Sequence, residues 1–101
     1  MTAYVIAEAE HLNTPEVIAY RELARAAVLQ YGGRYLARGA VPVALEGDWP
    51  EANRMVVMEF PSLERARSWY SSPEYAKARA TRSDLSGRRI LLVPGLDETG
   101  A

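Results

Sequence analysis

The chain has 101 residues, a formal net charge of −1, no cysteine and a single histidine, His11. With 49% hydrophobic and 25% charged residues it has the composition of one globular domain, too short for a second independent core. These numbers exclude disulfides, thiolate metal sites and metal centres built on several imidazoles. Because there is no basic excess, we expect no nucleic acid and no membrane as a partner, and nothing in the composition calls for a metal or cofactor.

The first expected elements are a strand and a helix. The run Ala3–Glu10 is strand-like, and both of its faces begin with apolar residues. The chain enters this strand without a basic, apolar leader, so we expect cytoplasmic residence. Thr14 and Pro15 then indicate a helix start, because Thr14 can cap free amides and Pro15 suits the first helical position. An apolar stripe at three- and four-residue steps predicts helix to about Tyr31, where two glycines end it.

Two more strands are expected in the middle of the chain. The first is predicted over Gly33–Arg38. The segment Val41–Glu46 either extends it irregularly or forms a short extra strand, and Pro42 favours a sheet edge. Turn residues follow, and the next strand is predicted over Arg54–Phe60, again with two apolar faces.

A broken helix and a last strand complete the pattern. Ser62 is the expected cap of the helix, and Ser72 with Pro73 repeats the start signal, so we expect the helix to break there and to restart. The restarted part is predicted to run to about Arg82 or Ser83. The last strand is expected over Arg88–Val93.

This β-α-β-β-α-β order predicts an α+β fold, a ferredoxin-like sandwich with a four-stranded antiparallel sheet and the helices on one face. We expect residues 1–96 to form one domain and residues 97–101 to form a flexible tail. The uncovered sheet face would show apolar side chains to water, so something must cover it. A second identical sheet would do so about a two-fold axis, giving a dimeric α+β barrel. A small apolar ligand or another protein is the alternative cover.

Four sequence features in this order resemble one bacterial family. They are GGRYLARG (32–39), LEGDW (45–49), MEFPSLERARSWYSSPEY (58–75) and Arg82, seven residues after Tyr75. Together they resemble the uncharacterised family called domain of unknown function number 1330, over nearly the whole chain. The resemblance implies a ferredoxin-like fold of the dimeric α+β barrel superfamily, and it implies no known activity. The chain departs from the family pattern at Ala40, where glycine is usual, and at Pro94, where an acidic residue is commoner.

A candidate binding site surrounds the loop between the second and third strands. Its residues offer two guanidinium groups, a carboxylate and an indole, a set that could hold a small aromatic or carboxylate-bearing molecule: Arg38, Glu46, Trp49 and Arg54. The alternative is structural. In that case one of the arginines pairs with Glu46 to hold the loop, and Trp49 packs over the barrel mouth or against a partner chain.

A second candidate cluster lies on the restarted helix. Tyr75, Arg79 and Arg82 are spaced to share one helix face, where a phenol and two cations could bind a carboxylate or phosphate. The alternative is that the arginines pair with acids such as Glu74 or with groups of a partner chain.

Three further titratable residues are weaker candidates. Glu8 and Glu59 interrupt apolar strands, so each is either a buried general base or, the favoured interpretation, a solvated or arginine-paired carboxylate. His11 could move protons near neutral pH, although a solvated loop position is favoured.

Together these features predict a homodimer that binds a small organic molecule, aromatic or carboxylate-bearing. Fold-level analogy with the wider superfamily adds a cofactor-independent oxygenase or isomerase as a possible activity. The alternative is a non-catalytic module whose sheet and aromatic residues only build an oligomer. A pocket of a few hundred cubic ångströms lined by the candidate residues would favour the first interpretation, and a filled interior with paired arginines would favour the second.

Overall fold

A computed structural model describes residues 2–10, 14–50, 53–82 and 88–96 of the chain. In these ranges the chain forms strands and helices in the predicted order. They are β1 (Ala3–Glu10), α1 (Pro15–Gln30), β2 (Arg34–Ala40), β3 (Asn53–Phe60), α2 (Leu63–Tyr70), α3 (Pro73–Arg79) and β4 (Arg89–Pro94).

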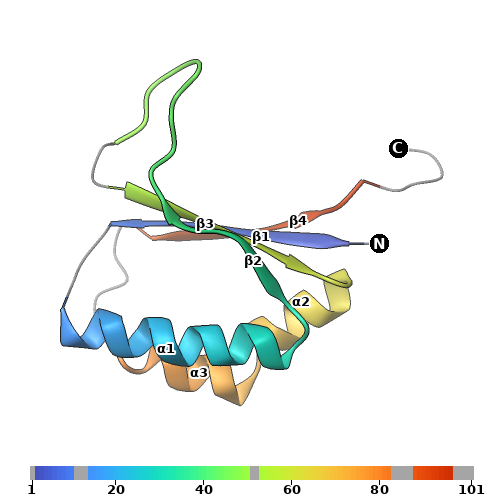
Figure 1. Ribbon diagram of the computed structural model, residues 1–101. Helices are drawn as coiled ribbons and strands as arrows, with labels where there is room; N and C mark the ends of the chain where they lie inside the picture. The colour runs from blue at the N-terminus through green and yellow to red at the C-terminus, as the bar shows by residue number, and fades with distance from the viewer. Residues whose placement is uncertain (1, 11–13, 51–52, 83–87, 97–101) are drawn as a thin grey trace.

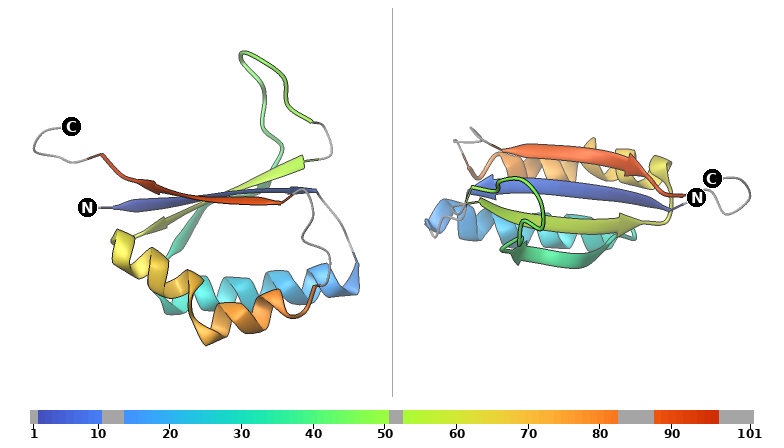
Figure 2. Two further views of the ribbon diagram at one scale, coloured as in Figure 1. Left: turned by 180° about the vertical axis from the view of Figure 1, so that it is seen from behind. Right: turned by 90° about the horizontal axis from the view of Figure 1, so that it is seen from above.

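The strands make one antiparallel sheet in the order β2-β3-β1-β4. Val5 of β1 lies opposite Met58 of β3 on one side and opposite Leu92 of β4 on the other. All three helices lie on the same face of this sheet, as Figures 1 and 2 show from three directions. The predicted α+β sandwich with helices on one face is confirmed.

Serine and threonine caps place the helix starts where the sequence predicts them. Thr14 Oγ1 accepts a hydrogen bond from the amide of Val17 at 3.2 Å, and Ser72 Oγ accepts one from the amide of Tyr75 at 3.0 Å. Each cap satisfies an amide that has no partner within its helix. The break between α2 and α3 is therefore confirmed, although α3 ends at Arg79, before the predicted Arg82 or Ser83.

The core lies between the sheet and the helices. Val28, Phe60 and Tyr75 are its largest fully buried side chains. The rings of Phe60 and Trp69 lie 5.3 Å apart, and Trp69 and Tyr75 are 4.5 Å apart. These aromatic contacts join α2 and α3 to the sheet and hold the helix layer in a defined position over it.

The opposite face of the sheet carries apolar side chains and has no helix over it (Figure 1). Leu91 is 56% exposed and Val93 is 38% exposed. The alternation along each paired strand places these residues on the same face, which we call the open face: Tyr4, Ile6, Met55, Val57, Leu91 and Val93. Surfaces of this kind mark interaction sites.

An arm of residues 41–50 joins β2 to the region before β3. Before the arm, β2 contains register shifts, and Gly39 there takes a φ of 73°, a left-handed conformation that favours glycine. The strand thus extends irregularly to Ala40, but residues 41–46 form no strand, so the predicted extension is shorter than expected. The arm rises from the side of the sheet that lacks helices (Figure 1), and Leu45 on it is 93% exposed.

None of the helices in the described ranges combines the length and the apolar character required to span a bilayer.

Candidate functional site

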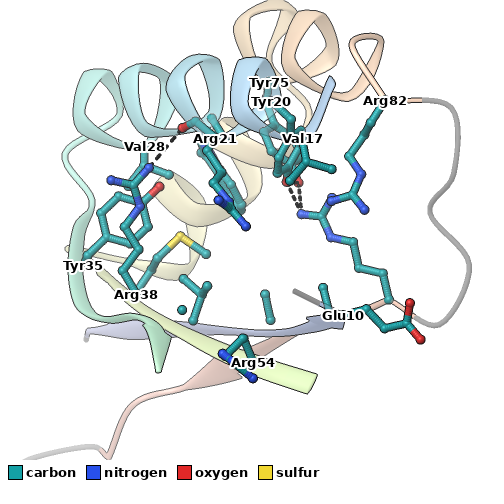
Figure 3. Close-up of a pocket in the computed structure, with 18 residues that line it drawn as sticks. Glu10, Val17, Tyr20, Arg21, Val28, Tyr35, Arg38, Arg54, Tyr75 and Arg82 are labelled. Atoms are coloured by element: carbon teal, nitrogen blue, oxygen red, sulfur yellow. Dashed lines mark hydrogen bonds between the residues drawn. The ribbon is translucent and has the colours of Figure 1, made fainter. Parts of the chain in front are cut away.

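A cavity of about 290 Å³ lies between the sheet and α1. This volume is just below the usual range for small-molecule sites, about 300 to 1,000 Å³, and suits a small ligand. Strands β1, β2 and β3 line it together with α1 and α3, and Figure 3 shows the lining side chains. Its apolar part consists mainly of small and aliphatic residues: Ala7, Ala9, Val17, Ala24, Val28, Val56 and Met58.

Helix α1 supplies one wall because of its residue spacing. Tyr20, Ala24 and Val28 recur at four-residue steps and therefore share the face that meets the sheet. Arg21 lies next to this stripe and lines the cavity too, half-buried.

Arginines give the cavity a positive charge. Five of the eleven arginines of the chain line it, whereas among the described lining residues Glu10 is the one carboxylate. They come from α1, β2, β3, the end of the α3 region and the start of the β4 region: Arg21, Arg38, Arg54, Arg82 and Arg88. Several guanidinium groups around an apolar cavity favour an anionic ligand with an apolar body.

The contacts that Arg38 makes with described residues leave its positive charge uncompensated at one side of the cavity. Its Nη2 donates a hydrogen bond to the backbone oxygen of Arg21 at 3.2 Å, and its guanidinium carbon lies 4.8 Å from the ring centre of Tyr35. Both partners are formally neutral, so neither contact cancels the positive charge. Burial raises the pKa of Tyr35, while the neighbouring Arg38 lowers it in part.

Tyr20, Tyr75 and Arg88 form a hydrogen-bonded cluster at the other side. The two phenol oxygens are 2.8 Å apart. Arg88 Nη2 donates to Tyr75 Oη at 2.9 Å and also to Tyr20 Oη. Burial raises the pKa of Tyr75 well above its ordinary value, and the nearby Tyr20 raises it further. Both phenols near the guanidinium raise the pKa of Arg88 although burial lowers it, so Arg88 is a permanent cation here.

The structure brings four of the six predicted binding residues together. Arg38, Arg54, Tyr75 and Arg82 all line the cavity. Glu46 is exposed on the arm and lies outside the lining, and Trp49 Nε1 donates to the backbone oxygen of Asn53 at 3.3 Å. Tyr20, Tyr35 and Arg88 also line the cavity and were not predicted as site residues. A role in binding remains a prediction for all of these residues.

The weaker candidates are located elsewhere. Glu59 pairs with Arg34 at 2.8 Å, and Glu8 accepts a hydrogen bond from Arg89 Nε at 2.6 Å, so both carboxylates are arginine-paired, the favoured interpretation. The strand alternation places both pairs on the open face, away from the cavity.

Two other predicted groups also fall outside the cavity. Arg79 does not line it, and its Nη1 lies 3.4 Å from Tyr70 Oη. His11 lies outside the described residues. In the described part of the chain, acidic and histidine side chains nowhere gather in a group of three that could bind a metal.

Comparisons with known proteins agree with the fold. The model of the family described as "Domain of unknown function (DUF1330)" matches residues 2–96. A protein of unknown function from Rhodopseudomonas palustris has a similar structure, with a TM-score of 0.67 and 18% identity, covering 94% of this chain and 83% of that one. A search of curated proteins finds no match.

Two further structural neighbours carry a more specific description. A candidate antibiotic biosynthesis monooxygenase from Nitrosomonas europaea has a TM-score of 0.57 and 18% identity, covering 98% of this chain and 94% of that one. A dimeric ferredoxin-like protein of unknown function from Jannaschia sp. CCS1 has a TM-score of 0.61 and 11% identity, covering 94% of this chain and 100% of that one. At these identities the likeness establishes the ferredoxin-like fold.

Proposed function

Because the chain belongs to the Domain of unknown function (DUF1330) family, whose description names no activity, we propose its function from the cavity: the chain binds a small organic carboxylate between the sheet and α1. The observation that carries this proposal is the gathering of five arginines around an apolar cavity in a chain of net charge −1. The guanidinium groups of such a site form charge-assisted hydrogen bonds with a carboxylate. Its alanines and valines make apolar contacts with the rest of the ligand.

We propose further that the chain acts as a homodimer joined through its open face. A face with Ile6, Val57 and Leu91 on it needs a cover, and a second copy provides a self-complementary one. The dimeric description of the Jannaschia neighbour supports this proposal. In that assembly the arm of residues 41–50, which rises on the same side, would lie toward the partner chain (Figure 1).

Chemistry on the bound acid is a second candidate function, as a cofactor-independent oxygenase or isomerase. The hydroxyl pair of Tyr20 and Tyr75 favours it, because phenols beside a cation can donate hydrogen bonds to a ligand oxygen on which negative charge develops. The N. europaea neighbour, described as a candidate monooxygenase, is consistent with the oxygenase form. Oxygen uptake or proton exchange into a bound acid in deuterium oxide would measure these activities, and both would be lost in Tyr75→Phe.

The alternative function is a non-catalytic interaction module. It would require the interior to be filled and the arginines to be paired. The cavity of about 290 Å³ and the charge of Arg38, whose contacts are with neutral groups, favour the ligand-binding proposal over this alternative.

A thermal-shift screen of the purified protein with aliphatic and aromatic carboxylates tests the proposal, because a ligand that binds only the folded form raises its stability by mass action. We expect benzoate-sized acids to raise the melting temperature of the parent and of Arg65→Ala, which removes an exposed arginine outside the cavity. The same acids should no longer raise the melting temperature of Arg38→Ala. An acid that stabilises all three proteins equally would place the site elsewhere, and a screen without any stabilising acid would refute the proposal.

A further inference from the structure

In the Tyr20–Tyr75–Arg88 cluster one phenol O–H has no hydrogen-bond acceptor within the cluster. Each phenol has one O–H to donate, and the contact between the two oxygens at 2.8 Å uses only one of them. Arg88 adds donors to both oxygens and accepts nothing. Among the described residues the other hydroxyl hydrogen has no acceptor. An oxygen atom of a bound ligand could accept this hydrogen bond.

Neighbouring side chains add further donors to the same side. Arg82 Nε is buried and has no hydrogen-bond partner among the described residues, and its guanidinium carbon lies 5.3 Å from the ring centre of Tyr20. Trp69, only 2% exposed, also lines the cavity, and its Nε1 likewise has no partner within the described ranges. A buried donor without an acceptor costs free energy, and a ligand oxygen would remove that cost.

Glu10 is the one carboxylate among the described lining residues, and Figure 3 shows it on this side, but no ion pair between described residues joins it to Arg82 or Arg88. The ion pairs formed between described residues are Arg34–Glu59 and Arg89–Glu8, and neither includes Arg82 or Arg88. We call the group of Arg82, Arg88 and the two phenols the tyrosine pole.

A second positive pole lies across the cavity from the first. Arg38 and Tyr35 lie at one side in Figure 3, and Tyr20, Tyr75 and Arg82 lie at the other. Arg38 belongs to the edge strand β2, while Arg88 immediately precedes the opposite edge strand β4. Three strand spacings separate these edges, about 14 Å between their backbones. Figure 3 also draws Arg38 apart from Tyr20 and Tyr75, with Arg21 between them, so each pole can receive its own carboxylate.

From this arrangement we infer that the natural ligand is a small organic diacid, with one carboxylate at Arg38 and the other at the tyrosine pole. This inference rests on the proposed function and makes it specific. The apolar residues of the cavity lining contact the ligand's hydrocarbon body. The second carboxylate accepts hydrogen bonds from the phenol hydrogen that has no acceptor and from Arg82 Nε.

Calorimetric titration of the full chain with matched acids tests the inference. Terephthalate is compared with benzoate, and adipate with hexanoate, because each pair shares a body and differs in the number of carboxylates. We expect the diacid of at least one pair to bind about tenfold more tightly or better, the gain that a second charge-assisted contact gives. Among linear diacids, one intermediate length should bind best, since β2 fixes the position of Arg38 and helices α1 and α3 fix the two phenols.

Variants at the tyrosine pole locate the second carboxylate. Arg82→Gln should reduce the diacid to the affinity of its matched monoacid, and Arg82→Lys should restore part of the difference because it keeps the charge. Arg65→Ala is the control for the loss of one surface charge. Circular dichroism is used to check that each variant is folded. Titration of Tyr75→Phe with the same acids tests the phenol pair independently.

The outcomes separate the inference from the proposed function. If monoacids bind as tightly as their matched diacids, the cavity binds carboxylates but the second pole does not, and the inference is wrong. The inference is also wrong if Arg82→Gln and Tyr75→Phe both keep the full diacid preference. If neither acid of either pair binds, the proposed function itself fails.

Discussion

Replacing Tyr75 by phenylalanine tests the buried cluster through the stability of the protein. The change keeps the ring, which lies 4.5 Å from Trp69, and removes hydrogen bonds of 2.8 Å to Tyr20 and 2.9 Å to Arg88. Hydrogen bonds contribute about 0.5 to 1.5 kcal/mol each, and about 1.5 to 3 kcal/mol when one partner is charged. Because Arg88 keeps its bond to Tyr20, we expect the free energy of unfolding to fall by about 2 kcal/mol at neutral pH.

The same variant should show a distinctive dependence on alkaline pH. Burial raises the pKa of Tyr75 in the folded chain, while in the unfolded chain a tyrosine ionises near pH 10. Above that value the folded state holds a proton that the unfolded state has lost, so the parent becomes less stable as pH rises. The variant lacks this group. The stability difference between the two proteins should therefore shrink by about 1.4 kcal/mol between pH 9 and pH 11.

Urea unfolding followed by circular dichroism, at one fixed protein concentration, measures both effects. Tyr70→Phe is the control, since it removes a hydroxyl from a residue that is 43% exposed and should change the free energy by less than about 0.5 kcal/mol. The reasoning is refuted if Tyr75→Phe is as stable as Tyr70→Phe at neutral pH. It is also refuted if the stability difference stays constant up to pH 11.

Three other substitutions probe the fold and the dimer. Gly33→Ala places a Cβ 2.6 Å from Phe60 Cε1, so we expect the free energy of unfolding, measured by thermal unfolding, to fall by about 1 to 3 kcal/mol. An unchanged melting temperature would show that the Phe60 side chain moves to accept the Cβ. Ser72→Ala removes the cap of α3 and should cost about 1 to 2 kcal/mol in the same assay, whereas a cost below about 0.3 kcal/mol would mean that the cap is not needed. Val57→Asp puts a charge in the open face, and light scattering should then report 11.2 kDa instead of the 22.4 kDa of two chains; a variant that stays dimeric would exclude this face as the interface.

Local signals made the fold predictable from the sequence. The pairs Thr14-Pro15 and Ser72-Pro73 mark helix starts through short-range capping, and both caps form as hydrogen bonds in the structure. The irregular end of β2 was harder to predict, since register shifts in a strand depend on its pairing with β3. The arm of residues 41–50 shows this limit, because its Val41–Glu46 segment reads like a strand and forms none.

The candidate site was only partly predictable, because it depends on contacts between distant segments. Tyr20 follows the apolar stripe of α1, so its periodicity indicates a core residue and hides its hydroxyl contact with Tyr75, 55 positions away. Arg88 was predicted only as the first residue of the last strand, and its side chain contacts Tyr20, 68 positions away. Glu46 and Trp49 were grouped with Arg38 by closeness in sequence, but the arm carries them out of the cavity lining.

Chemical-shift mapping by nuclear magnetic resonance, during titration of ¹⁵N-labelled protein with terephthalate, tests the central claim most directly. The account predicts that the amides of Tyr20, Arg38, Tyr75 and Arg88 shift together in a saturable manner, while the amide of Leu91 on the open face does not. Saturable shifts confined to the open face or to the arm, or no shifts at millimolar ligand, would contradict a carboxylate site between the sheet and α1.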